Sequence, residues 1–532
     1  MTKVCFAVLL GWLASGAMAA EDTVDYRVNQ RDTLIGIGKE ILDRPADWPQ
    51  VQRVNRVRDP LRLKPGSILK IPASLMKPDP VPARVESVAG AVSLLGGKTL
   101  SKGDEVPQGA TVITGADGYL ALSLPDQSRV LVRPGSRLRI DELLQRRGSG
   151  AQSARMGVEA GRIENEVAPQ KGPAARYEIR TPTAVIGVRG TRFRASYEAD
   201  SARSLLEVTE GSVAAAAGKA PTQAVSAGFG SVLAQGSATS PAALLAAPSL
   251  DEVPPLFERP LIRLPLPPMY AGQRWRLVVA ASQDFATPVY EGLEPTSEAR
   301  VAGLPDGDYR FRLRGVADNG LEGMDAEGRF KLKARPEPPF PIAPQNAGKT
   351  REPRMPLNWT GQPAAKTYRL QIATDADFKT LVLQKDDISD TRLTAELPLG
   401  EYFWRLASVR ADGDRGPWGD AQRFAMAAPQ GPPEKPAMED GKVSFAWPGE
   451  PGQTFEFEMA SDPEFKNVVE RRKVNVARLD LPQPAAGMWY IRVRATDADG
   501  YVGQWSDTQQ LEVPRDWRWL WLTPALLLLL AL

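Results

Sequence analysis

Few residue types in this chain could perform nucleophilic, acid-base or metal chemistry. The sequence of 532 residues has no histidine, and its single cysteine is Cys5. Catalysis by Ser-His-Asp or Cys-His groups is therefore excluded, as are zinc sites built from cysteine and histidine. An enzyme built on this chain would need paired carboxylates or a Ser-Lys dyad.

Two short motifs could supply such chemistry. Ser67-Ile-Leu-Lys70 matches the Ser-x-x-Lys pattern of penicillin-binding enzymes. However, we expect a strand here, and residues three apart in a strand face opposite sides. Asp497-Ala-Asp499-Gly500 is similar to the start of a calcium loop, but it lacks the further aspartate and the distal glutamate. We therefore predict a plain turn at this motif. For the chain as a whole, we predict no catalytic residue, no metal and no cofactor.

Arginine and tryptophan side chains give further candidate sites. Arg189 stands between Gly187 and Gly190, which could let a ligand approach the backbone. We favour a bulge or tight corner, with the arginine paired to a local carboxylate. Trp418 and Trp505 follow turns and could stack on sugars, although packing at a strand edge is the favoured interpretation.

The overall composition limits the class of protein. Lys and Arg total 66 against 64 Asp and Glu, so no global field steers nucleic acid to the chain, and we predict no nucleic-acid partner. Charged residues make up 24% and hydrophobic residues 42%, which fits neither disorder nor a polytopic membrane protein. The length predicts about three to four domains, and the 46 glycines and 47 prolines favour many turns and short strands.

Both ends of the chain carry apolar segments. Residues 1–20 contain Lys3, an apolar stretch and Ala17-Met18-Ala19, which predicts a cleaved secretory signal peptide rather than a membrane anchor. Residues 515–532 combine three tryptophans with a leucine-rich end that is short for a membrane span. We expect a shallow membrane contact there. The alternatives are a partner-binding tail or a sequence that stops early.

Residues 24–73 read as strand, helix, helix, strand. The helical patterns run over 35–42 and 48–55, Asp32 is expected to cap the first helix, and Pro65-Gly66 turns into the last strand. With its opening Tyr-x-Val, its Asp-Thr-Leu turn and its closing Leu-x-Pro-Gly-x-x-Leu-x-Ile-Pro, the segment resembles the lysin motif (LysM).

The LysM resemblance implies a βααβ module that binds N-acetylglucosamine-containing glycans such as peptidoglycan. It places the sugar groove between the first strand-helix loop and the last helix-strand loop. The candidate glycan-binding residues are Asp32, Thr33, Leu34, Asn55, Leu61 and Leu63. A role as a cap or core residue is the alternative for each. Arg31 replaces the family's usual glycine, and the second loop carries Arg56, Arg58 and Arg62, so binding is expected to be weakened or shifted toward anionic glycans or peptide stems.

A second module of antiparallel β structure is expected over 84–235, because apolar and polar residues alternate between turns. Gly90-Ala-Val, Thr114-Gly, Pro125-Asp-Gln-Ser and above all the run from Thr181 to Phe193 resemble the periplasmic FecR-type domain. That family relays signals from outer-membrane receptors to sigma factors, using a cytoplasmic segment and a membrane span ahead of the β domain. Here a signal peptide and a LysM-like module are expected in that place, so the sigma-factor role does not carry over to this chain. What the resemblance implies is an exported β module for sensing or partner interaction.

The remainder of the chain repeats with a period near 90 residues. Phe285, Phe378 and Phe465 hold the same place in three similar lines, 93 and 87 residues apart. Alternating strands with Asx-Gly turns predict seven-stranded sandwiches that resemble fibronectin type III domains. Trp359 and Trp447 stand where that family keeps a core tryptophan, which the first repeat lacks. The predicted repeats cover 264–335, 340–428 and 432–514, a proline-rich spacer covers 74–83, and a linker covers 236–263.

Together these patterns predict a mainly β, multidomain protein with a small βααβ LysM module, an all-β FecR-like domain and three β-sandwich repeats. We expect an exported, non-enzymatic scaffold in the periplasm or cell envelope of a Gram-negative bacterium. Its predicted partners are peptidoglycan and an envelope protein. A signal-transduction component acting through the FecR-like domain is the alternative, and the missing histidine and cysteine disfavour a wall-cleaving enzyme.

Overall fold

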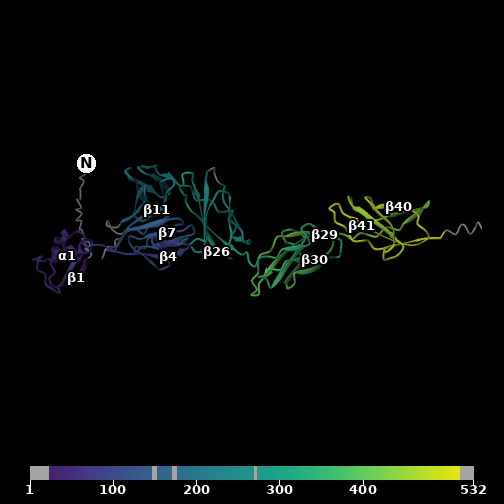
Figure 1. Ribbon diagram of the computed structural model, residues 1–532, viewed down its shortest axis with the longest axis horizontal. Coiled ribbons are helices and arrows are strands. Elements are labelled where there is room, and N and C mark those ends of the chain that lie inside the picture. Colours follow the sequence, from purple (N-terminus) through teal and green to yellow (C-terminus); the bar gives the residue numbers. More distant parts are fainter. Residues whose placement is uncertain (1–22, 146–151, 170–175, 269–271, 516–532) are drawn as a thin grey trace, which may run out of the picture. The chain divides into compact units, whose positions relative to one another are not determined.

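The computed structural model describes residues 23–145, 152–169, 176–268 and 272–515. It divides into two compact units, Met1–Leu332 and Lys333–Leu532. The predicted fold class is confirmed, because the described residues form many short β-strands and one small helical module (Figure 1). Within these ranges, no helix is long and apolar enough to cross a membrane. The predicted signal peptide and nearly all of the predicted tail lie outside the described residues.

A βααβ module begins the first unit. Its elements are β1 (Thr23–Arg27), α1 (Leu34–Ile41), α2 (Trp48–Asn55) and β2 (Ile68–Pro72), with 3-10 turns at Pro45–Asp47 and Ala73–Leu75. The two strands pair antiparallel, and both helices pack on a core that includes Leu34, Val51 and Ile71. The predicted order of strand, helix, helix and strand is confirmed.

The predicted cap of α1 is wrong by one residue. Thr33 has extended backbone angles, and its Oγ1 accepts a hydrogen bond from the Gly36 N–H at 3.0 Å. The Asp32 carboxylate instead turns toward the preceding loop, where it accepts from the Tyr26 hydroxyl at 2.9 Å and the Asn29 N–H at 2.6 Å. Both side chains satisfy backbone groups, but only the threonine lies where the orphan N–H groups of the helix point.

The second module is built from two β-sheets around one continuous hydrophobic core. Its strands are β3 (Asp79–Pro80), β4 (Ala83–Ala89), β5 (Val92–Leu94), β6 (Glu105–Val106), β7 (Thr111–Thr114), β8 (Tyr119–Ser123), β9 (Arg129–Val132), β10 (Arg137–Gln145), β11 (Gln152–Glu166), β12 (Arg176–Arg180), β13 (Ala184–Val188), β14 (Arg192–Glu198), β15 (Arg203–Glu210), β16 (Ser212–Ala217), β17 (Gln223–Ser226), β18 (Phe229–Ala234), β19 (Ser237–Ala238) and β20 (Ala242–Ala243). All pair antiparallel except β11 with β12, which run parallel. That pair corrects the expectation of purely antiparallel structure.

Strand β11 belongs to both sheets. Its first part pairs with β10 and β12, and its second part pairs with β9 and β14. Gly161 lies at the change of sheet with φ +80°, and a Cβ there would meet Ser136 Cα at 2.5 Å. Only glycine fits a backbone that has positive φ and approaches another strand so closely.

Neither predicted linker is a free spacer. Within 74–83, Met76 is buried in the core of the βααβ module and β3 pairs with β10. Within 236–263, β20 pairs with β18, and the Leu245 carbonyl accepts from the Met324 N–H at 2.8 Å. Proline and alanine disfavour a central strand, but two-residue edge strands and side-chain packing remain open to them.

Three β-sandwiches follow. The first contains β21 (Leu256–Phe257), β22 (Ile262–Pro265), β23 (Arg274–Ala280), β24 (Tyr290–Glu294), β25 (Glu298–Val301), β26 (Gly307–Val316) and β27 (Ala326–Leu332). The second contains β28 (Pro341–Ala343), β29 (Gly348–Thr350), β30 (Arg354–Trp359), β31 (Thr367–Ala373), β32 (Leu381–Ile388), β33 (Arg392–Glu396), β34 (Gly400–Val409) and β35 (Gln422–Met426). The third contains β36 (Ala437–Glu439), β37 (Lys442–Ala446), β38 (Thr454–Ala460), β39 (Val468–Val474), β40 (Arg478–Pro482), β41 (Gly487–Thr496) and β42 (Gln509–Val513). Trp359 and Trp447 are buried in the second and third cores, as the repeat pattern predicts.

Candidate binding sites

Two loops of the βααβ module come together beside α1. The first loop joins β1 to α1, and the second joins α2 to β2. The Leu34 N–H donates to the Pro60 carbonyl at 2.8 Å, which fixes the second loop against the start of the helix. The structure therefore brings together the two loops that the LysM resemblance assigns to a glycan groove.

Most of the six predicted glycan-binding residues have structural roles. Thr33 caps α1, Asp32 holds the preceding loop, and Leu34 is 1% exposed in the core. The Asn55 amide donates to the Lys70 carbonyl and accepts from the Lys70 N–H, both at 2.7 Å, so it joins α2 to β2. Leu63 packs half-buried against the core.

Leu61 differs from these five residues because its side chain is 60% exposed. It lies in the second loop next to Pro60, and its N–H donates to Asp59 Oδ1 at 2.9 Å. The backbone is thus fixed while the apolar side chain remains in solvent. Of the predicted set, this side chain is the best placed to contact a ligand.

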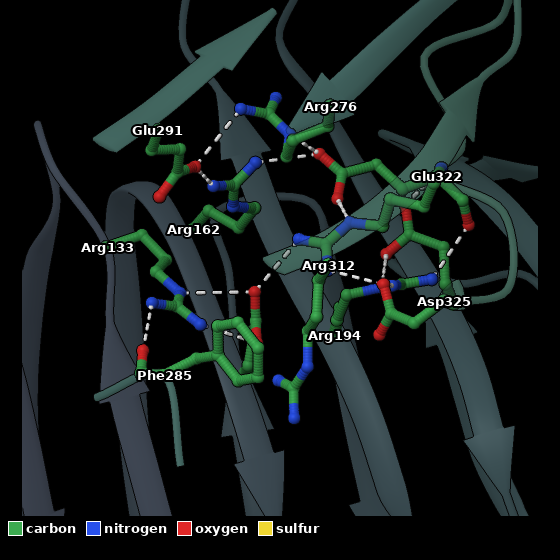
Figure 2. A network of polar contacts seen from close by, with 12 residues as sticks. Arg133, Arg162, Arg194, Arg276, Phe285, Glu291, Arg312, Glu322 and Asp325 are labelled. Carbon is green, nitrogen blue, oxygen red and sulfur yellow. Dashed lines mark hydrogen bonds and ion pairs between the residues drawn. The ribbon is translucent and has the colours of Figure 1, made fainter. Parts of the chain in front are cut away.

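A different site lies where the FecR-like domain meets the first sandwich, within the first unit (Figure 2). Along β9, β11, β14 and β15, residues of the hydrophobic core alternate with residues of the opposite face, several of which are charged. The first sandwich covers that charged face. Arg133, Arg162 and Arg194 belong to the FecR-like side, and Arg276, Glu291 and Glu322 belong to the sandwich (Figure 2). Arg314, on β26 of the sandwich, also belongs to the network.

Glu322 is the centre of this junction network. Its carboxylate pairs with Arg162 at 2.7 Å, Arg276 at 2.5 Å and Arg314 at 2.5 Å. Arg314 also pairs with Glu164 across the junction at 3.0 Å. The Arg314 and Glu322 side chains are only 1% and 6% exposed, so the charges are desolvated and must compensate each other.

The network shifts the pKa values of its two buried acids in opposite directions. Burial by itself would raise the pKa of Glu322, but Arg162 and Arg314 hold it well below the usual range. Glu207 on β15 is also buried, and its Oε1 accepts from the Glu322 N–H at 3.1 Å. Burial raises the pKa of Glu207 to about 7, because the attraction of Arg194 is partly cancelled by the charge of Glu322.

A cleft of about 480 Å³ opens beside the network. Residues from both modules line it: Arg129, Leu131, Glu164, Asn165, Glu166, Arg192, Phe193, Arg194, Thr209, Glu210, Gln283, Asp284, Arg312, Met324, Asp325 and Glu327. Arg129 joins the two walls by pairing with Asp284 at 3.0 Å, and it also pairs with Glu86 of its own module at 2.7 Å. This cleft has the mixed polar and apolar lining that can hold a segment of a partner.

One difference between the repeats coincides with this junction, although the repeat pattern by itself does not predict the contact. In the second and third repeats, Trp418 and Trp505 follow by two residues a glycine whose N–H donates to the preceding strand. The equivalent glycine in the first repeat is Gly323, and Asp325 stands in place of the tryptophan. A repeat that replaces an aromatic surface residue with an acid is a candidate for docking on a basic neighbour.

The other motifs serve packing. The guanidinium carbon of Arg405 lies 4.8 Å from the centre of the Trp418 ring, and that of Arg494 lies 4.5 Å from the centre of the Trp505 ring. A guanidinium group therefore lies over each of the two rings. The turn at Asp497 docks on the preceding sandwich, where Arg351 and Lys349 pair with its carboxylate at 2.8 and 2.7 Å. No group of acidic or thiol side chains able to hold a metal occurs in the described ranges. Arg189 is exposed beside Gly190, whose φ is +72°.

Comparison with known proteins supports one of the modules directly. The family model described as FecR protein matches residues 110–214, which confirms the FecR resemblance over the central part of the predicted domain. None of the curated proteins matches the chain.

Solved structures are similar to parts of the chain. A candidate anti-sigma factor from Parabacteroides distasonis is 14% identical with a TM-score of 0.21, and the match covers 26% of this chain and 68% of that one. Another structure described in the same way has a TM-score of 0.20 at 14% identity, and this chain matches only 53% of its length, against 23% of its own. Fibronectin(III)-like modules of Clostridium thermocellum CbhA are 13% identical with a TM-score of 0.22, covering 33% of this chain and 94% of that one.

Proposed function

We propose that this chain is a non-catalytic protein of the bacterial cell envelope that binds peptidoglycan through its βααβ module. The supporting observation is the meeting of the two loops at the Leu34–Pro60 hydrogen bond, which leaves Leu61 60% exposed beside them. An exposed leucine on a fixed loop can pack on the apolar face of a sugar ring while the loop backbone bonds to its polar groups.

Co-sedimentation with insoluble peptidoglycan tests this function. The chain from residue 21 is compared with a chain that begins at Pro78, because Met76 and Lys77 still contact the βααβ module. Only the longer chain should pellet. Loss of sedimentation in Leu61→Ser but not in Val54→Ser would locate the contact, since Val54 is also exposed, at 44%, but lies on α2. Equal pelleting of the long and short chains would refute the proposal.

A second candidate function is supported by the FecR family match. In this alternative, the FecR-like domain and the first sandwich form one body that binds an envelope protein at the junction cleft. A photo-crosslinking residue at Gln283, in the cleft lining, should capture one defined envelope protein. The same residue at Thr296, exposed elsewhere on the sandwich, should not capture it. Capture of the same protein from both positions would contradict a site in the cleft.

A further inference from the structure

The charge of this chain is distributed unevenly. Residues 23–77 contain 11 Lys and Arg against six Asp and Glu, whereas the chain from residue 78 onward contains 54 against 56. The near-zero net charge of the whole protein therefore conceals one basic module. A local excess of positive charge attracts anions at short range even where the whole molecule exerts no field.

Arginines gather on the two loops that meet beside α1. Arg31 lies in the first loop, and Arg56, Arg58 and Arg62 lie in the second. The hydrogen bond from Leu34 to Pro60 holds the loops together, and Arg58 and Arg62 each lie two residues from Pro60. These positions put four arginines on the two loops that border the proposed glycan groove.

None of these four arginines forms an ion pair in the part of the chain that the structure describes, and all four are exposed. The acids closest to them in sequence are engaged within the loops, since Asp32 accepts from Asn29 and Asp59 accepts from Leu61. The contrast with the junction is clear, because Arg162, Arg276 and Arg314 there each contact carboxylates. The loop arginines have no intramolecular electrostatic role that would account for them.

The backbone gives a second, independent observation. Arg31 has φ +73° and Arg56 has φ +50°, in the left-handed region where a side chain is unfavourable and glycine is preferred. Glycine at Arg31 would relieve this cost without removing any contact that the structure records. Arginine at position 31 is therefore unfavourable for the local backbone, which supports a role outside the fold.

We propose that the groove selects an anionic glycan, in which carboxylates carried by the peptide stems of peptidoglycan bind Arg31, Arg58 and Arg62 while a sugar ring packs on Leu61. The inference rests on the proposed peptidoglycan function and specifies its ligand. Guanidinium groups bind carboxylates with charge-assisted, often bidentate hydrogen bonds. Exposed pairs of this kind are weakened by salt, whereas packing of a sugar on leucine is not.

Binding is measured by titrating the chain from residue 21 with two soluble probes. One is a peptidoglycan glycan fragment that keeps its peptide stems, and the other is an N-acetylglucosamine oligomer with the same number of sugars, which carries no carboxylate. The stem-bearing fragment should bind more tightly. Its advantage should disappear as ionic strength rises from about 0.01 M to about 1 M, where the Debye length falls from about 30 Å to about 3 Å.

A matched pair of triple variants identifies the groups responsible. Arg31→Gln, Arg58→Gln and Arg62→Gln together should weaken binding of the stem-bearing fragment roughly tenfold or more and leave binding of the N-acetylglucosamine oligomer unaffected. Lys39→Gln, Arg44→Gln and Arg53→Gln remove the same charge from exposed positions on or near the two helices and should change neither affinity. Circular dichroism of both variants verifies that the fold is retained.

The outcomes separate the inference from the function it rests on. Equal, salt-independent affinity for the two probes would overturn the anionic selection and leave peptidoglycan binding intact. Equal losses in the two triple variants would show a general electrostatic attraction and would also overturn the assignment to these arginines. Binding of neither probe would overturn the proposed function together with the inference.

Discussion

Replacing Glu322 with glutamine should open the junction between the FecR-like domain and the first sandwich. The change removes the charge that Arg162, Arg276 and Arg314 share, while those arginines remain buried. Removing one partner from a buried ion network lowers stability by about 3–5 kcal/mol, because the remaining charges stay buried without compensation. We expect the lower end, because Glu291 still pairs with Arg276 at 3.1 Å and Glu164 still pairs with Arg314 at 3.0 Å.

Hydrogen exchange measured by mass spectrometry on the full chain can locate this effect. If the junction opens as a unit, a loss of about 3 kcal/mol speeds amide exchange roughly 150-fold in the segments it protects. The affected segments should be the second half of β11, β14 and β15, which carry the charged face. The sandwiches of the second unit should exchange as before.

The matched control is Glu327→Gln, on the same sandwich. Glu327 pairs with Arg312 at 2.7 Å, but its side chain is 49% exposed. An exposed pair contributes about 0–1 kcal/mol, so exchange should rise less than about sixfold. If the Glu322 and Glu327 variants exchange alike, the junction network does not hold the two modules together, and the reasoning from burial fails.

Three further predictions concern pH, the second unit and the bend in β11. The pKa of Glu207 is raised to about 7, so the folded junction still binds a proton that the unfolded chain releases near pH 4.5. Junction stability should therefore fall as pH rises from about 4.5 to about 7. Glu207→Gln should remove this pH dependence of amide exchange, and an unchanged pH profile in that variant would contradict the prediction. Asp497→Asn should destabilise the contact with the preceding sandwich by about 2–4 kcal/mol, seen as faster exchange at residues 349–351, whereas Asp499→Asn, with a side chain that is 56% exposed, should have little effect. Gly161→Ala should lower the melting temperature of the FecR-like domain far more than Gly135→Ala. Both glycines have positive φ, but only at Gly161 does the added Cβ have neighbours within 4 Å. Equal shifts of the melting temperature in differential scanning calorimetry would show that the close approach at the bend has no cost.

Local patterns predicted many elements of the chain, although they missed the short strands within the two predicted linkers. In the βααβ module, helix periodicity between two apolar strands predicted α1 and α2 to within a residue, since spacing and turn residues act over a few positions. The core tryptophans of the repeats and the alternating strands of the FecR-like domain were predicted for the same reason. The error over the cap of α1 arose because Asp32 and Thr33 are both good caps, and the local hydrogen bonds of Asp32 to Tyr26 and Asn29 decided between them.

What the sequence determined by itself is the excluded chemistry, the order of modules and the alternation of core and surface positions. It could not determine which surfaces become interfaces. A strand such as β14, with Arg192 and Arg194 opposite Phe193, has the same pattern whether its charged face meets water or another domain. Only the tertiary structure placed Glu322 over that face, because the free energy of the buried network depends on charges that lie more than 100 residues apart in the chain, such as Arg162 and Glu322, which are 160 positions apart.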